Sequence, residues 1–421
     1  MTNELEQARR LADEGDVPGA IRALRFTADA APLVDLAVIM QQLATAADFD
    51  DLATAARAVA SEPADAKALT VFGYECVERG VSFLAVPFLR EALLRAPDSH
   101  LALAELVTAL EDEYRHHEAA EVLIANESML RPWPERYLLV YNSILASDLP
   151  RARTEFARLT PPDDDRWLFA RDRVARMLSR ADRVEPISAL DHHDLRGWHF
   201  TLTGGYLATL SPYGFRAGMT GRWAYLGDSP QMCRYSLDRL SLILNASGRR
   251  PRSVSMLPDR SSAILGLAAG QLLGLPIQPY APGGTDTVVV AYNLRDLDPD
   301  LLNTLRERAD GQILYEHATC WTSPPPVSAD VSGLLHQVVV EPWAAKQRVD
   351  NDPLPADTRR EPKIAVDIVL ADGTPDTGDD ETPPDLDPAF AAFITATRDT
   401  WLTGPRTPMN SPGPVRSSHF G

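Results

Sequence analysis

Six polar residues near the middle of the chain have types and positions suited to binding an anion: Asp259, Arg260, Ser261, Ser262, Asn293 and Arg295. The first four separate a β-branched run, residues 253–257, from a run of small residues, 263–274, with helical composition. This order predicts a strand, a short loop and a helix. The free backbone N–H groups at a helix N-terminus favour an anion, and Arg260 would add a bidentate partner for phosphate.

The same four loop residues also admit a purely structural interpretation. Asp259 or Ser261 would cap the helix, and Arg260 would be solvated. We therefore treat the six residues as an anion-binding candidate, assign no catalytic residue, and leave both interpretations open.

Strands and helices alternate around these residues, over 186–345. The runs 276–280, 287–294 and 311–318 are predicted strands, and 230–247 and 299–309 are predicted helices. This alternation predicts an α/β domain with a mostly parallel sheet, in which residues 287–292 form a central strand buried on both faces. Ligands bind beyond the carboxyl ends of such strands, where the six polar residues fall. Nearer the start of this domain, two β-prone runs flank Gly204–Gly205, and this pattern predicts a β-hairpin.

The front of the chain, residues 1–185, repeats with a period of about 34 residues. The clearest copy carries Leu, Gly, Cys, Ala, Leu, Ala and Pro at the packing positions of a helical hairpin: Leu69, Gly73, Cys76, Ala85, Leu89, Ala92 and Pro97. This stretch resembles a tetratricopeptide repeat (TPR). Small residues such as Gly73 and Ala85 let two helices approach closely. We expect a TPR-like α-solenoid of roughly five hairpins, followed by a further helix over 165–182. The resemblance implies a concave surface that holds a protein or peptide, or alternatively a rigid arm or a dimer surface.

The α/β region resembles the phosphoribosyltransferase-type fold over residues 225–320. The resemblance rests on the strand that enters the polar loop and on Leu273–Pro276, which end the following helix. Asn293 and Arg295 stand where that family has two acidic residues, and no Thr/Gly-rich phosphate loop follows. The resemblance therefore implies a degenerate relative or another Rossmann-like domain, without ordinary phosphoribosyl transfer.

Three groups of histidines invite a metal or nucleophile interpretation. His116 and His117 are adjacent on a predicted helix and point about 100° apart, which favours a solvated turn. A second group is Asp191, His192, His193, Asp194 and His199, and a third is Glu316, His317 and Cys320. Neither of these two has zinc-ligand spacing with a matching second half. His317 and Cys320 would also suit a base and nucleophile pair. We assign no metal and no cofactor, and interpret these groups as linker and strand-end packing.

Composition excludes several classes of protein. The formal net charge of −18 argues against wrapping nucleic acid, where Lys and Arg must replace counterions. No run of 18 apolar residues exists, so no membrane span is expected. The three cysteines are far apart, which is typical of reduced thiols and predicts a cytoplasmic protein.

Residues 346–421 form an acidic, Pro-rich tail. Its composition predicts a flexible linker over 371–388 and disorder over 404–421, with one edge strand over 363–371 and one helix over 388–401. The whole pattern favours an adaptor that binds a protein or peptide on its solenoid, with an α/β domain for that partner or a small anionic ligand. The alternative is an enzyme acting on a nucleotide or phosphorylated metabolite, recruited by the solenoid.

Overall fold

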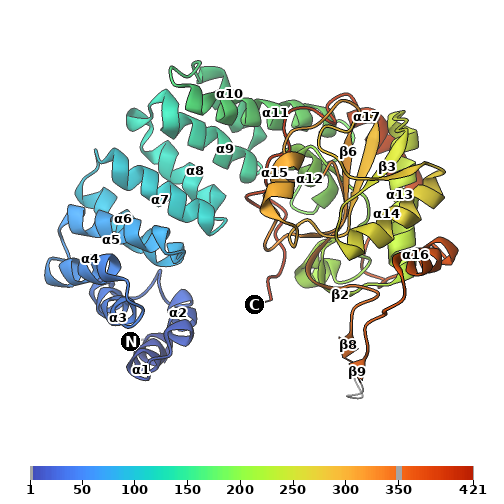
Figure 1. The fold of residues 1–421 in the computed structure, drawn as a ribbon. Helices are drawn as coiled ribbons and strands as arrows, with labels where there is room; N and C mark the ends of the chain where they lie inside the picture. Colours follow the sequence, from blue (N-terminus) through green and yellow to red (C-terminus); the bar gives the residue numbers. More distant parts are fainter. Residues whose placement is uncertain (1–2, 348–352, 421) are drawn as a thin grey trace. The chain divides into compact units, whose positions relative to one another are not determined.

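A computed structural model describes residues 3–347 and 353–420 of the chain. It divides into two compact units, Met1–Val174 and Ala175–Gly421, and the division falls inside helix α11, Leu168–Val184 (Figure 1). Among the described residues, no helix combines the length and apolarity needed to cross a membrane.

The first unit is helical. Its described residues form ten α-helices before α11: α1 (Asn3–Asp13), α2 (Val17–Arg25), α3 (Leu33–Ala46), α4 (Asp50–Ser61), α5 (Ala66–Glu78), α6 (Ser82–Arg95), α7 (His100–Asp112), α8 (His116–Ala125), α9 (Tyr137–Leu145) and α10 (Leu149–Arg158). Successive helices pack as five pairs, α1 with α2 through α9 with α10, and neighbouring pairs contact one another. The expected five helical hairpins are therefore present in the fold.

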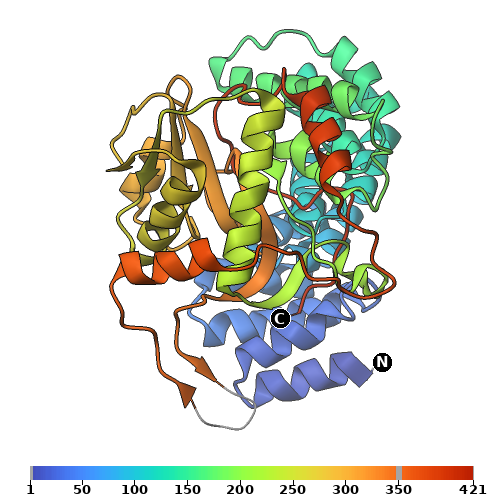
Figure 2. The same ribbon diagram turned by 90° about the vertical axis from the view of Figure 1, so that its right-hand side faces the viewer.

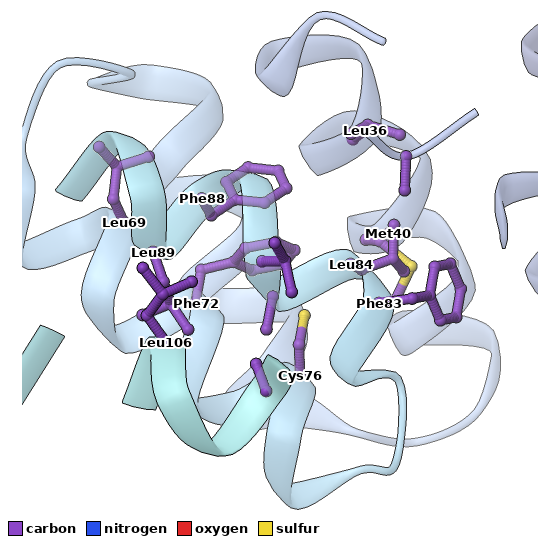
Figure 3. Close-up of a cluster of buried hydrophobic side chains, with 14 of the residues drawn as sticks. Leu36, Met40, Leu69, Phe72, Cys76, Phe83, Leu84, Phe88, Leu89 and Leu106 are labelled. Carbon is purple, nitrogen blue, oxygen red and sulfur yellow. The ribbon is translucent and has the colours of Figure 1, made fainter. Parts of the chain in front are cut away.

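Small residues allow the two helices of a pair to approach closely, as expected. A Cβ atom on Gly73 of α5 would lie 2.4 Å from Cγ of Leu89 on α6. Next to it, the rings of Phe72 and Phe88 meet edge to face, with their centroids 4.5 Å apart (Figure 3). The buried side chains of successive pairs join into one continuous core, so each pair depends on its neighbours.

The second unit contains a parallel sheet. Its strands are β1 (Tyr206–Leu207), β2 (Trp223–Gly227), β3 (Ser253–Met256), β4 (Ile277–Pro279), β5 (Thr287–Ala291), β6 (Ile313–Cys320) and β7 (Val331–Val340). The strand order is β1-β7-β6-β5-β3-β4, and β2 pairs with a later part of β7. Every pairing in this sheet is parallel. A separate antiparallel pair consists of β8 (Lys346–Gln347) and β9 (Pro353–Leu354).

Helices cover both faces of the sheet: α12 (Leu195–Thr203), α13 (Pro230–Ser247), α14 (Arg260–Leu273), α15 (Pro299–Leu305), α16 (Glu361–Leu370) and α17 (Asp387–Thr397). α13 and α14 pack against strands, α16 packs on both of these helices, and α17 packs on α13 (Figure 2). Every residue of β5 is buried, which confirms its predicted central position. An apolar run without alternation is typical of a strand that is covered on both faces.

The hairpin predicted around Gly204–Gly205 is wrong. The residues before it form α12, which Asp194 caps by accepting a hydrogen bond from the Gly197 amide at 2.8 Å. Gly204 ends this helix in the left-handed region, with φ of 78°. A glycine that accepts positive φ serves a helix C-terminus as readily as a tight turn. The residues after it form β1, which pairs in parallel with β7.

The predictions for the acidic tail also need correction. Residues 363–371 do not form an edge strand, because most of them belong to α16, whose buried side chains Ile364, Ala365 and Ile368 form a helical stripe. The helix predicted over 388–401 is confirmed by α17. In the segment expected to be a flexible linker, Asp385 accepts hydrogen bonds from Arg196 and Arg239 at 2.8–2.9 Å. The composition of the segment did not indicate these arginine partners, which lie far away in the sequence.

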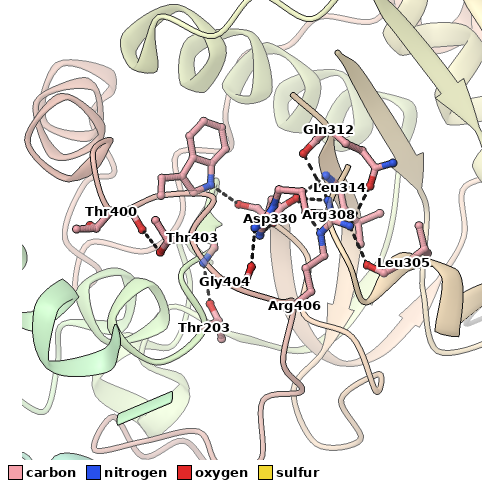
Figure 4. A network of polar contacts seen from close by, with 12 residues as sticks. Thr203, Leu305, Arg308, Gln312, Leu314, Asp330, Thr400, Thr403, Gly404 and Arg406 are labelled. Atoms are coloured by element: carbon pink, nitrogen blue, oxygen red, sulfur yellow. Dashed lines mark hydrogen bonds and ion pairs between the residues drawn. The ribbon is translucent and has the colours of Figure 1, made fainter. Parts of the chain in front are cut away.

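The end of the tail is packed rather than disordered. Arg406 is 1% exposed in its side chain and bonds Oδ2 of Asp330 through Nε at 2.9 Å and Nη2 at 2.7 Å. Its Nη1 donates to the backbone oxygen of Leu305 at 2.8 Å and to Oε1 of Gln312 at 3.0 Å (Figure 4). Trp401 donates to the backbone oxygen of Asp330. The tail is therefore a structural part of the second unit.

Candidate functional site

The sheet topology brings two loops together beyond the carboxyl ends of β3 and β5. β3 is followed by α14 and pairs with β4 on one side, whereas β5 is followed by α15 and pairs with β6 on the other side. The two connections leave in opposite directions, so the loops after β3 and β5 flank a topological switch point. All six predicted anion-binding residues lie in these two loops or at the start of α14.

The loop after β3 is tied to the end of β5. Asp259 caps α14, since its Oδ1 accepts a hydrogen bond from the Ser262 amide at 2.8 Å. The Ser262 hydroxyl in turn accepts a hydrogen bond from the Tyr292 amide at 2.9 Å. Arg260 is exposed and donates to the backbone oxygens of Asp357 at 2.7 Å and Arg359 at 3.1 Å. Asp259 therefore caps the helix, as the structural interpretation expected. Arg260 was expected to be solvated, but it donates hydrogen bonds to the backbone of the tail.

Glu316 of β6 bonds the backbone of the loop after β5. Its Oε1 accepts a hydrogen bond from the Leu294 amide at 2.7 Å. Burial raises the pKa of Glu316 to about 7, although bonds from Thr319 and Leu294 act to lower it. In this loop, Asn293 Oδ1 accepts a hydrogen bond from the Arg295 amide at 2.9 Å. The fold thus places both predicted loops at one edge, and anion binding there stays a prediction.

Two residues after β7, Glu341 and Trp343, bond the start of α14 and were not predicted from the sequence. Ser261 donates its hydroxyl proton to Oε1 of Glu341 at 2.8 Å and accepts a hydrogen bond from Nε1 of Trp343 at 2.9 Å. Burial raises the pKa of Glu341, and the charges of Asp259 and Asp296 raise it further. These carboxylates oppose an additional negative charge beside α14. The signal for this contact in the sequence was Glu341, a charged residue directly after the apolar run 338–340.

A buried polar cluster lies deeper at the same side of the sheet. It consists of Asp228, which follows β2, Cys233 in the first turn of α13, Tyr292 after β5, and His317 in β6. Oδ2 of Asp228 lies 3.0 Å from Nε2 of His317 and 3.4 Å from Sγ of Cys233, and the Tyr292 hydroxyl donates to it at 2.7 Å. Sγ of Cys233 lies 3.7 Å from Nε2 of His317.

The cluster does not have the geometry of a nucleophile activated by a histidine and a carboxylate. Such a relay uses both ring nitrogens, one for the nucleophile and one for the orienting acid. Here Asp228 and Cys233 both lie beside Nε2 of His317. Burial, followed by the charge of Asp228, raises the pKa of the Cys233 thiol well above its ordinary value. Burial acts to raise the pKa of Asp228, but His317, Tyr292 and the Ser229 amide outweigh it and lower the pKa.

No model of a known protein family matches the chain, and no curated protein matches it either. The site must therefore be interpreted from its own geometry.

The other histidine groups separate in the fold. His317 and Cys320 are three residues apart on β6, so their side chains point to opposite faces, and the base and nucleophile pair is not formed. In the group near α12, Asp194 serves as its N-cap. His199 is buried, and burial followed by the charges of Arg222 and Arg196 lowers its pKa to about 3. The solvated turn expected at His116 is wrong, because His116 is buried at the start of α8 and its Nδ1 lies 2.9 Å from Oδ1 of Asn142.

Proposed function

We propose that the helical unit binds an extended segment of a protein partner and that the α/β unit is attached to this binding module. The observation that carries the proposal is a set of exposed apolar side chains on the first helices of three successive pairs: Val34, Val38, Val71, Tyr74 and Leu101, which are 39–59% exposed. We call this set the apolar stripe. The resemblance to TPR proteins supports the same interpretation.

The repeat relates part of the stripe. Val34 and Val38 are four residues apart on α3, and Val71 and Tyr74 are three apart on α5, so the two residues on each helix share a face. Val38 and Val71 are the sixth residues of α3 and α5, so they take equivalent positions in neighbouring helix pairs of the stack. In the second helices of the first four pairs, α2, α4, α6 and α8, the exposed large apolar residues of the described chain fall at the ends, as Leu94 does in α6.

A charge placed in the stripe should abolish this binding. Peptides selected by the full-length chain from a random displayed library should bind the Val38→Glu/Val71→Glu variant at least about tenfold more weakly, because losing two buried apolar anchors costs more than about 1.4 kcal/mol. Fluorescence anisotropy with the selected peptides measures the change.

Leu94→Glu is the matched control, since Leu94 is 75% exposed on α6, the second helix of its pair, and is not part of the stripe. It should bind as the unmodified chain does. Equal binding by the stripe variant, or a library that yields no enriched peptide, would refute the proposal.

A second candidate function rests on the two polar loops at the switch point, against the opposing charge of Asp259, Asp296 and Glu341: binding of a small anionic ligand, or turnover of a nucleotide or phosphorylated metabolite. In a thermal-shift series with inorganic phosphate, nucleotides and phosphoribosyl pyrophosphate, a ligand at 100 times its Kd stabilises the folded state by about 2.7 kcal/mol. Arg260→Ala should remove this ligand-induced increment.

Arg252→Ala is the control for that series. Arg252 directly precedes β3, at the amino end of the strand, and its side chain is 84% exposed. It should retain the whole increment. Ligand-independent melting curves would eliminate this candidate, and an increment that survives Arg260→Ala would move the ligand away from the α14 terminus.

A further inference from the structure

The buried cluster of Asp228, Cys233 and His317 contains the three types of ligand atom that proteins use for zinc: a carboxylate oxygen, a thiol sulfur and an imidazole nitrogen. They come from three separate elements, the end of β2, the start of α13 and the middle of β6. Cys233 and His317 are 84 residues apart in sequence, so no local sequence motif marks the site. From this convergence we propose that Asp228, Cys233 and His317 bind Zn²⁺.

The distances between the three ligand atoms fit a tetrahedral metal. Zinc binds nitrogen and oxygen at about 2.0–2.2 Å and sulfur at about 2.3 Å, which separates ligand atoms in a tetrahedron by roughly 3.3–3.7 Å. The observed separations are 3.0 Å for oxygen and nitrogen, 3.4 Å for oxygen and sulfur, and 3.7 Å for nitrogen and sulfur. The triangle therefore has nearly the size of one tetrahedral face.

Three polar groups crowd one atom of the cluster. Tyr292, His317 and Cys233 all approach the same carboxylate atom, Oδ2 of Asp228. A cation between the oxygen, nitrogen and sulfur atoms would replace two of these contacts by metal bonds, because the thiol proton leaves to solvent and the sulfur becomes an anionic ligand.

The surrounding residues orient the ligands as the outer shell of a metal site does. Nδ1 of His317 lies 3.4 Å from the Tyr315 hydroxyl, which lies 2.7 Å from the Ser236 hydroxyl. The Ser229 amide donates to Oδ1 of Asp228 at 2.7 Å, which leaves Oδ2 directed into the cluster. Metal-binding histidines commonly bond a polar partner through their second nitrogen, and this partner fixes the ring.

The donor set selects zinc among common cations. Magnesium and calcium require oxygen ligands, whereas a thiolate with an imidazole suits zinc. The three ligands are buried, so the metal would join α13 to β2 and β6 and would stabilise the unit, with its fourth coordination position left to water.

The test measures metal in the full-length chain. Protein refolded with Zn²⁺ and then dialysed should retain about one equivalent of zinc by elemental analysis. Protein refolded with Co²⁺ should show a sulfur-to-cobalt charge-transfer band and the visible bands of a tetrahedral site. Cys233→Ser should lose the charge-transfer band and most of the retained metal.

Cys320→Ser is the matched control. Cys320 is buried in the same sheet, but its sulfur bonds the backbone oxygen of Gln337, away from the cluster. This variant should keep both the metal and the cobalt spectrum. Loss of metal in both variants would mean that the cysteine substitutions act through the fold, and would overturn the assignment.

A second measurement does not depend on any variant. The unmodified chain refolded with a chelator should melt at a lower temperature than the chain refolded with Zn²⁺, and added Zn²⁺ should restore the higher value. Absence of retained metal together with identical melting curves would overturn the proposal and leave a hydrogen-bonded network.

Discussion

Replacing Arg406 by alanine should destabilise the α/β unit by about 3–5 kcal/mol, the usual cost of leaving a buried charge without its partner. Arg406 and Asp330 are 1% and 3% exposed in their side chains, and the guanidinium also bonds Leu305 and Gln312. Urea unfolding gives the free energy, and hydrogen exchange in peptides from β6 and β7 assigns the loss to this unit.

The effect of Arg406→Ala should shrink at acid pH. Burial acts to raise the pKa of Asp330, but Arg406 and Arg308 outweigh it and hold the pKa below its ordinary value. A carboxyl group with a lowered pKa stabilises the fold above its unfolded pKa, about 3.9, and this contribution is lost as the pH falls through the folded pKa. The difference between the two unfolding energies should therefore begin to shrink as the pH falls below about 3.9 and should be lost as it falls through the folded pKa of Asp330.

Arg398→Ala is the control for this prediction, because Arg398 is an exposed tail residue just after α17. It should change the free energy of unfolding by less than about 0.5 kcal/mol. A similarly small effect of Arg406→Ala would show that the tail is not needed for the stability of the sheet.

Phe88→Ala should destabilise the helical unit by about 3–5 kcal/mol, since it removes a buried aromatic side chain and leaves a cavity. Phe88 is fully buried and its ring packs edge to face on Phe72 of the facing helix. Because stacked pairs are stabilised by their neighbours, the loss should spread from α5 and α6 to the adjacent pairs. Hydrogen exchange across α3 to α8 measures this spread.

Leu94→Ala provides the comparison on the same helix. Leu94 is 75% exposed, so its truncation should cost less than about 0.5 kcal/mol. Loss of protection confined to α6 after Phe88→Ala would contradict coupling between the pairs.

Local pattern was sufficient to predict the order of elements in most of the chain. The small residues Gly73 and Ala85 indicated close helix pairs, and the all-apolar run of β5 indicated a strand covered on both faces. The helix predicted over 230–247 matches α13, where Ser229 caps the start by accepting a hydrogen bond from the Met232 amide. These signals act over a few residues, so a single sequence carries them.

Features that depend on distant partners could not be predicted. The acidic tail has the composition of a linker, yet Asp385 meets Arg196 and Arg239, which lie 189 and 146 residues away. The glycines after α12 suit a turn and a helix end equally, and the pairing of β1 with β7 decides between them.

The candidate site also combines features set by local sequence with features set by distant partners. The two loops at the switch point follow from the alternation of strands and helices, so their six polar residues were found. Asp228 and His317 are 89 residues apart, and only the order of β2, β7 and β6 in the sheet brings them together.

The return of the tail to the sheet has a consequence for biosynthesis. A chain leaves the ribosome from its amino end, and domains generally fold as units in that order. The helix pairs are complete early in translation, whereas Asp330 of the nascent α/β unit waits for Arg406 to emerge. We therefore expect the helical unit to fold first and the α/β unit to stay incomplete until the last residues are synthesised.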